Sequence, residues 1–158
     1  MKRITIAAMA LLLCSQAFSQ DRHMFFVWAD AQVYEDKELE YVRTAAADMK
    51  AVADAAGVEC FAVHVGDLIG EFGESPDFKT VSEACESSGI PFRYVVGNHD
   101  LDHKAETLDG RKAAWRGQFG QNYYSFNMGQ VHYVVLDDVD PTGNGWQVRG
   151  YIDPAQLK

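Results

Sequence analysis

One pattern occurs three times in this sequence: a short, continuous apolar run that stops at a polar group. Runs of roughly four to eight apolar residues are typical of strands buried on both faces, as in parallel sheets. Between successive runs, apolar residues recur at helical spacing. Strands that alternate with helices predict right-handed, parallel βαβ crossovers, so the expected fold class is α/β. The runs comprise residues 24–28, 60–65 and 92–96, and the helices extend from Asp36 to Gly57 and from Ser75 to Gly89.

The residues after the third run predict a short helix, a hairpin, a loop and the opening of a further helix. In the hairpin, Met128-Gly129-Gln130 separates the two strands. The loop is rich in Gly and Asp, and Asp153-Pro154 supplies an N-cap and a first helical position. The short helix comprises residues 111–119, and the two hairpin strands comprise residues 123–127 and 131–136. The loop comprises residues 138–150 and the further helix residues 151–158.

Residues 1–19 have the three parts of a secretory signal peptide: a charged start, an apolar stretch and a small-residue cleavage pattern. The apolar stretch is shorter than the ~18 residues that a spanning helix needs, so we expect no stable membrane insertion. A lipid-anchored form through Cys14 ranks second. The sequence therefore predicts an exported protein, periplasmic or extracellular, whose mature part is residues 20–158.

The chain is acidic, with 14 basic and 23 acidic residues and a formal charge of −9. Removal of the predicted signal peptide leaves 12 basic residues and a charge of −11. Such a balance offers no basic surface for the phosphates of a nucleic acid, so we expect no nucleic-acid partner. A small phosphorylated substrate is compatible with it, because a bound divalent ion reverses the local field.

Two cysteines lie outside the predicted signal peptide. Cys60 opens the second apolar run and Cys85 lies on the apolar face of a predicted helix, and both positions suit a small buried thiol. A disulfide between them stays an alternative, because an exported compartment permits it and the sequence does not give the Cα separation.

Polar side chains follow the end of each predicted strand. The carboxyl ends of parallel strands meet at one edge of a sheet, where α/β proteins bind ligands. Oxygens of Asp and Asn suit hard or borderline divalent ions, and a carboxylate between two strands can bridge two ions about 3.5–4 Å apart. Turn formation is the plainer interpretation of Gly-Asp and Gly-Asn pairs, but three ordered strand ends favour a metal site. In chain order these residues are Asp30, Gln32, Asp67, Asn98, His99 and Asp100.

From Met24 onward, the motifs resemble the N-terminal part of the calcineurin-like metallophosphoesterase family. Asp30-Ala31-Gln32 occupies the place of the family's D-x-H motif, Gly66-Asp67 that of its G-D motif, and Gly97-Asn98-His99-Asp100 is a complete G-N-H-D motif. The segment predicted as a hairpin is similar to the hairpin that follows in the family. The resemblance implies a partial four-layer α/β/β/α sandwich with its C-terminal half missing.

The resemblance also implies a mechanism for an exported phosphoesterase that hydrolyses phosphomonoesters or phosphodiesters. Two divalent metal ions (Mn, Fe or Zn) would be bound, with Asp67 between them, and a metal-bridging hydroxide would attack phosphorus. His99 would stabilise the phosphoryl oxygen or protonate the leaving alkoxide, and Asp100 would orient the His99 ring. The implied metal ligands are Asp30, Gln32, Asp67 and Asn98.

The sequence departs from the family pattern in two respects. Gln32 takes the place of a histidine, and a neutral amide oxygen is a weaker donor for Zn or Fe. No histidine follows His132, although the later ligands of the family are histidines. We therefore expect an N-terminal fragment of a longer enzyme, with little activity alone. A non-catalytic binding module on the same scaffold is the alternative, and the charge disfavours a nuclease.

Other residues leave structural and functional interpretations open. His64 and His132 lie inside apolar runs, which predicts buried, hydrogen-bonded side chains rather than ligands. We expect His23 to be solvated. His103 lies either at the pocket mouth or in a solvated loop, and Trp146 either shapes a substrate pocket or covers the core.

Overall fold

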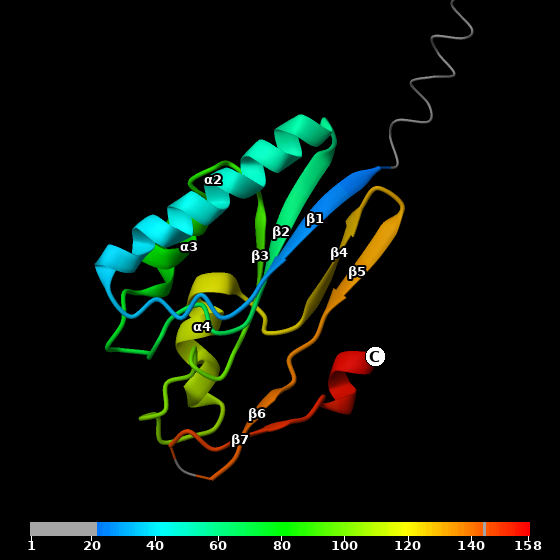
Figure 1. Ribbon diagram of the computed structural model, residues 1–158. Coiled ribbons are helices and arrows are strands. Elements are labelled where there is room, and N and C mark those ends of the chain that lie inside the picture. Colours follow the sequence, from blue (N-terminus) through cyan, green and yellow to red (C-terminus); the bar gives the residue numbers. More distant parts are fainter. Residues whose placement is uncertain (1–21, 144) are drawn as a thin grey trace, which may run out of the picture.

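The computed structural model describes residues 22–143 and 145–158 (Figure 1). The predicted signal peptide and Cys14 lie outside the described residues. Within the described part, helices and small sheets make a mixed α/β structure, which confirms the predicted class. No helix in that part of the chain is long and apolar enough to cross a membrane.

Three parallel strands form the central sheet in the order β1-β2-β3. Each differs from its predicted apolar run by no more than one residue at either end. The two crossovers between them contain helices, as the alternating pattern predicts. The strands are β1 (His23–Trp28), β2 (Glu59–Val65) and β3 (Phe92–Val95).

Helix α2 (Leu39–Ala56) makes the first crossover. A 3₁₀ turn at Asp36–Glu38 precedes it, and the capping residue of that turn is Glu35, not the predicted Asp36. The helix ends as predicted at Gly57, whose left-handed φ of 62° closes the last turn.

Helix α3 (Phe78–Glu86) makes the second crossover. It begins later than the predicted Ser75, because Asp77 is the residue whose carboxylate accepts the Thr80 N–H, at 2.7 Å. Helix α4 (Ala113–Phe119) follows β3 and agrees with the predicted short helix.

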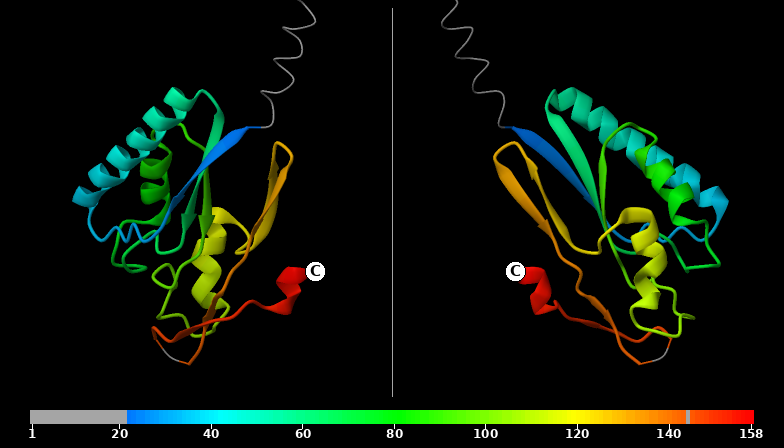
Figure 2. Two further views of the ribbon diagram at one scale, coloured as in Figure 1. Left: turned by 45° about the vertical axis from the view of Figure 1, so that its right-hand side comes forward. Right: turned by 180° about the vertical axis from the view of Figure 1, so that it is seen from behind.

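Helices α2 and α3 cover one face of the parallel sheet (Figure 2). Alternate strand residues point to this face, because side chains of a strand alternate between the two sides. Cys85 is buried here, and both Cys60 and Cys85 are free thiols, so there is no disulfide between them. The core on this side includes Val42, Ala62, Val81, Cys85, Phe92 and Tyr94.

The other face of the sheet packs against the predicted hairpin, which consists of β4 (Tyr124–Met128) and β5 (Val131–Val135). Phe61 of β2 meets Phe126 and Tyr133 edge-on, with ring centroids 5.4 and 5.1 Å apart. Such pairs stabilise a contact beyond the area they bury. The described residues thus form three layers: helices, parallel sheet and hairpin. They do not include the second outer helix layer of a four-layer sandwich.

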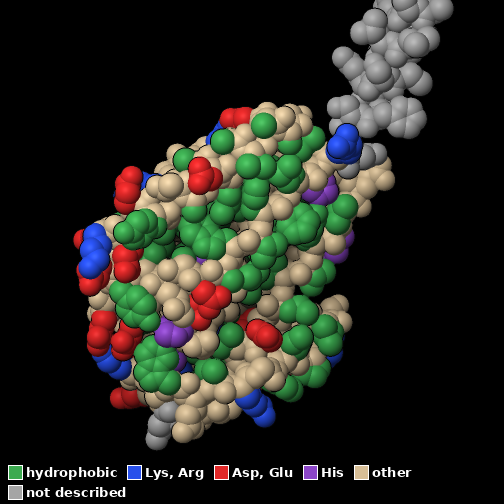
Figure 3. Space-filling view, viewed as in Figure 1, with side chains coloured by type: hydrophobic (Ala, Val, Ile, Leu, Met, Phe, Trp, Pro, Cys, Tyr) green, Lys and Arg blue, Asp and Glu red, His purple; other side chains and the backbone are tan. Residues whose placement is uncertain are grey.

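The hairpin covers this face only in part. Val27 and Val65 are 63% and 42% exposed. Hydrophobic atoms are accordingly visible along this side of the molecule in Figure 3.

The segment predicted as a loop contains a second small hairpin, so that prediction is wrong. Its strands are β6 (Val139–Pro141) and β7 (Val148–Gly150), paired antiparallel. Each has three residues, too few for an alternating pattern to be recognised. The chain continues into a 3₁₀ helix at Pro154–Leu157, capped by Asp153 as predicted.

Candidate metal and phosphate site

Residues from all three strand ends line one depression at the carboxyl edge of the parallel sheet. Asp30 follows β1, Asp67 follows β2 and Asn98 follows β3, and the depression they share has a volume of about 340 Å³. Asp138, between β5 and β6, lines it as well. No sequence pattern predicts a site residue at Asp138, because its place depends on the path of the chain after the hairpin.

Asp67 lies between the other strand ends. Its Oδ1 accepts the backbone N–H of His99 at 2.9 Å, and its Oδ2 accepts the side-chain amide of Gln32 at 3.4 Å. Gln32 is therefore joined to the same cluster. Because the amide nitrogen of Gln32 faces Asp67, its amide oxygen is left as a possible donor to a cation.

The backbone at this edge has an unusual conformation. Asp30, Gln32 and Asp67 have φ values of 54°, 42° and 56°, and they are the only left-handed non-glycine residues in the described part of the chain. Each such residue costs roughly 1–2 kcal/mol relative to the right-handed form. Backbone hydrogen bonds hold two of them: the Asp30 N–H donates to Gly66 O at 3.2 Å and the Gln32 N–H to Asp67 O at 2.9 Å.

Glycines allow the strand ends to come this close. A Cβ on Gly97 would lie 2.1 Å from both the backbone nitrogen and Oδ1 of Asp67. A Cβ on Gly66 would lie 3.2 Å from Gly97 Cα. The glycines before Asp67 and Asn98 therefore have the close-approach role expected from the sequence.

Asp100 stabilises the backbone at the carboxyl edge of the sheet. It does not contact the His99 ring, so the prediction that Asp100 orients this ring is wrong. Its buried carboxylate accepts backbone N–H groups from Gly97 at 2.8 Å, Asp67 at 3.0 Å, Leu68 at 2.9 Å and Ile69 at 3.2 Å. Asp100 thus ties the ends of β2 and β3 together.

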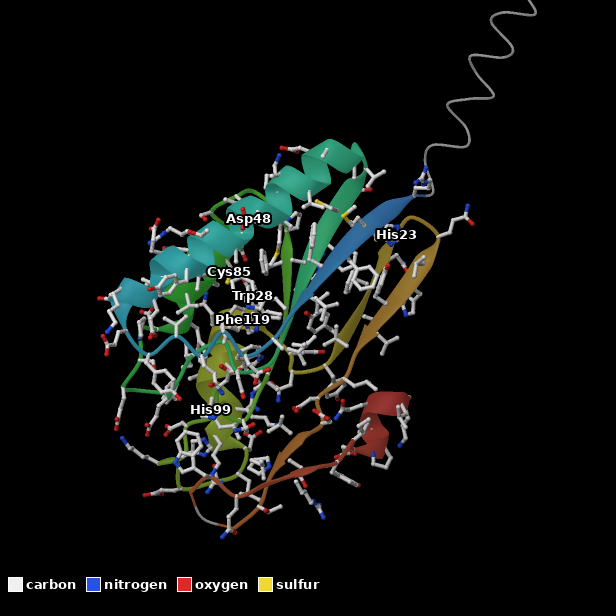
Figure 4. The ribbon with its side chains drawn as sticks, in the orientation of Figure 1. His23, Trp28, Asp48, Cys85, His99 and Phe119 are labelled. Atoms are coloured by element: carbon white, nitrogen blue, oxygen red, sulfur yellow. The ribbon has the colours of Figure 1, made fainter. Side chains whose placement is uncertain are left out.

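His99 is oriented by a backbone carbonyl. Its Nδ1–H donates to Gly70 O at 2.6 Å, which leaves Nε2 as the free ring nitrogen. A Cβ on Gly70 would lie 2.3 Å from the Tyr34 ring, so a glycine is needed at the residue that positions His99. Figure 4 shows His99 at the end of the sheet where these loops meet.

The remaining histidines differ in part from expectation. His64 is buried as predicted, but neither ring nitrogen has a hydrogen-bond partner among the described residues. Burial lowers its pKa to about 4, against a smaller raising effect of Asp67. His132 is exposed on the outer side of β5, where it donates to Asn127 Oδ1 at 2.7 Å. His23 is half-buried and bonds to the Tyr133 hydroxyl.

His103 and Trp146 pack against each other. Their ring centroids are 3.7 Å apart, and Trp146 is also 5.0 Å from His99. The two ring nitrogens of His103 lie 2.9 Å from Asn98 O and 3.1 Å from Gly145 O, and a neutral imidazole donates to one of these carbonyls. Both residues therefore pack beside His99 and Asn98, and neither lines the depression that Asp30, Asp67 and Asn98 share. The two interpretations of each residue stay predictions.

The donor atoms at this edge are carboxylate and amide oxygens, which suit a hard divalent cation. Within residues 22–143 and 145–158, no three His, Cys, Asp or Glu side chains form a group that could hold a metal ion. A cation here would therefore depend on Asn98 or Gln32 as well as on the carboxylates. The residues fit a weakly held, oxygen-preferring ion better than a zinc ion.

Three comparisons with known proteins were made: with protein-family models, with curated proteins and with solved structures. None of them found a match to this chain.

Proposed function

We propose that the chain supplies the metal- and phosphate-binding groups of an exported, divalent-metal-dependent phosphoesterase that acts on phosphomonoesters or phosphodiesters. The main support is the left-handed backbone at Asp30, Gln32 and Asp67, which coincides with three of the four ligands implied by the resemblance. Backbone strain of this kind persists only where the surrounding structure holds it, and it clusters at functional sites.

In this proposal Asp30, Asp67 and Asn98 hold divalent ions, with oxygens of Gln32 and Asp138 completing the set. Bound ions would lower the pKa of a water molecule and neutralise charge on the phosphate. Among Mn, Fe and Zn, the oxygen donors favour Mn²⁺. The substrate is a small phosphorylated molecule, because the acidic chain lacks a surface for nucleic acid.

His99 is the proton-transfer group. As the oxygen of water bonds to phosphorus, the ester P–O bond breaks and the leaving alkoxide takes a proton. A protonated Nε2 of His99 supplies that proton, and the proton that the attacking water loses returns to Nε2 through solvent. Gly70 O accepts the Nδ1–H both before and after the transfer, so the ring keeps its orientation. Asp100 acts only through the backbone, by fixing the loop that presents His99.

A non-catalytic binding module is the second candidate. It is favoured by the lack, among the described residues, of three His, Cys, Asp or Glu side chains grouped to hold a metal. It is also favoured by Gln32, a neutral residue in a place where the related family has histidine. Such a module would bind a phosphorylated ligand without hydrolysing it.

Hydrolysis of p-nitrophenyl phosphate and bis(p-nitrophenyl) phosphate with added Mn²⁺ separates the two candidates. A phosphoesterase gives Mn²⁺-dependent turnover, and His99→Ala lowers kcat by about 10²–10⁴-fold while Mn²⁺ binding is kept. Because little activity is expected of this chain alone, the criterion is the wild-type rate relative to that of His99→Ala. Mn²⁺ binding with no turnover above that of His99→Ala identifies the binding module. Loss of Mn²⁺ in His99→Ala would show that the role assigned to His99 is wrong.

A further inference from the structure

Trp146 is a large hydrophobic side chain left partly in solvent beside the site. It is 44% exposed, and its ring centroid lies 5.0 Å from that of His99. The ring of His103 lies at 3.7 Å with an interplanar angle of 32°, so His103 covers part of the indole. The partly exposed indole thus lies beside the histidine that would face the scissile phosphoester.

The backbone beside Trp146 is held in place from two directions. Arg111, 4% exposed, donates to Gly143 O and Gly145 O, both at 3.0 Å. From the other side, a ring nitrogen of His103 lies within hydrogen-bond distance of Gly145 O, at 3.1 Å. These bonds connect the residue before Trp146 to the 3₁₀ turn that precedes α4 and to the loop after β3.

Arg111 is buried, and its hydrogen bonds to the carbonyls of Gly143 and Gly145 fix the backbone beside Trp146. Among the described residues its guanidinium forms no ion pair, and its Nε has no hydrogen-bond partner. Burying a guanidinium without a carboxylate is unfavourable. The contacts that it does make fix the carbonyls next to Trp146.

We propose that Trp146 determines substrate specificity, by stacking on an aromatic group carried by the phosphoester. The inference rests on the proposed function and extends it to a substrate class. Aromatic rings stack with centroids about 4.5–7 Å apart, so a ring joined to the phosphate next to His99 is within reach of Trp146. A methyl group has no ring to stack on the indole.

Binding of non-hydrolysable phosphonates tests this inference without a need for turnover. Phenylphosphonate and methylphosphonate are titrated calorimetrically into the full chain with Mn²⁺ present. We expect wild type to prefer phenylphosphonate by about tenfold, which corresponds to about 1.4 kcal/mol. Trp146→Ala and Trp146→Leu should abolish the preference, and Trp146→Phe should keep most of it. Methylphosphonate should bind all four proteins within about twofold, since it has no ring to stack on residue 146.

A third probe, the methylene phosphonate of adenosine, distinguishes two sources of the aromatic ring. If wild type binds the adenosine phosphonate more tightly than phenylphosphonate, and Trp146 is needed for that preference, the aromatic group of the substrate is a nucleobase. If it binds phenylphosphonate more tightly, the aromatic group is a simple aryl ring. Trp146→Leu separates stacking from mere burial of apolar surface, because leucine is apolar but has no ring.

A phenyl preference that survives in Trp146→Ala, or that wild type lacks, overturns the inference but leaves the proposed function standing. If neither phosphonate binds in the presence of Mn²⁺, the proposed function fails and this inference fails with it. Thermal melts of the Trp146 variants identify any that do not fold. Trp146→Phe then remains as the folded comparison, because it must keep the preference that Trp146→Leu loses.

Discussion

Asp100 lies under the carboxyl edge of the parallel sheet and His64 lies on the helix-covered face, and both side chains are inaccessible to solvent. Their surroundings differ. The Asp100 carboxylate accepts four backbone N–H groups. His64 has no hydrogen-bond partner among the described residues, and it packs against the Trp28 ring with centroids 5.7 Å apart.

A buried polar group therefore has different effects at the carboxyl edge and on the helix-covered face of the sheet. At the edge, the two loops after β2 and β3 leave the sheet with N–H groups that the strand ladder no longer uses, and one carboxylate joins four of them. On the helix-covered face the neighbours of His64 across the strands are Trp28 and Tyr94, which belong to the apolar core. The imidazole of His64 therefore joins no backbone groups there and packs as a flat ring within the apolar core.

The largest expected effect comes from Asp100→Asn. An amide NH₂ in place of either carboxylate oxygen faces two backbone N–H donors, so at least two hydrogen bonds are lost. We expect the free energy of unfolding to fall by about 3–5 kcal/mol, measured by urea denaturation.

Asp48→Asn is the matched control for this substitution. Asp48 is exposed on helix α2, away from His99 (Figure 4). This change should alter the free energy of unfolding by less than about 0.5 kcal/mol. A similar small effect for Asp100→Asn would mean that the Asp100 network does not hold the edge.

His64→Leu should have a pH-dependent effect in the opposite direction. The folded pKa of about 4 lies below the ordinary value of 6.5, so the unfolded chain binds the extra proton first as the pH falls. Wild type therefore loses stability from pH 6.5 down to pH 4, by about 3 kcal/mol from this group. The variant lacks that loss.

The measurement for His64 is the difference in unfolding free energy between His64→Leu and wild type. It should be small at pH 7, where replacing a buried polar group by an apolar one of similar size is close to neutral. It should grow to about 3 kcal/mol in favour of the variant at pH 4. A difference that does not change with pH would mean that His64 is solvated or paired in solution.

Gly97→Ala should have a smaller effect, confined to the edge. The added Cβ would lie 2.1 Å from the backbone nitrogen and Oδ1 of Asp67. The φ of Gly97 is outside the left-handed region, so the expected loss of stability comes from steric overlap and not from backbone strain. We expect a loss of about 1–3 kcal/mol in unfolding free energy, together with weaker Mn²⁺ binding.

Gly117→Ala provides the comparison for Gly97→Ala. Gly117 lies in α4, and a Cβ there meets no described atom within 4 Å. Because alanine favours helix, this variant should gain roughly 0.5–1 kcal/mol and bind Mn²⁺ as wild type does. Unchanged Mn²⁺ binding in Gly97→Ala would contradict the role given to the close approach at the edge.

The sequence predicts which residues lie at the carboxyl edge better than it predicts the hydrogen bonds that Asp100 makes there. The ends of β1, β2 and β3 were predictable because apolar runs and helical spacing indicate parallel crossovers, and parallel strands end at one edge. That places Asp30, Asp67 and Asn98 together. The partners of Asp100 are not predictable, since they come from the two loops after β2 and β3, whose paths depend on packing between distant segments.

The sequence also does not show which neighbours His64 and His132 meet in the fold. Position within an apolar run predicts that a side chain lies in a strand, but not which neighbours it meets. His64 was therefore expected to have a hydrogen-bond partner, and His132 was expected to be buried although its side of β5 faces outward. Trp146 and Asp138 depend on the β6–β7 hairpin, whose strands are too short for their pattern to be seen.

Binding of Mn²⁺ to wild type, Asp67→Asn and Asp48→Asn, followed by electron paramagnetic resonance, tests the central claim most directly. If the three strand ends form a cation site around Asp67, wild type and Asp48→Asn bind with equal affinity. Asp67→Asn, which removes a charged ligand, then binds at least about tenfold more weakly. Equal affinity of all three proteins would show that the cation does not bind at this edge.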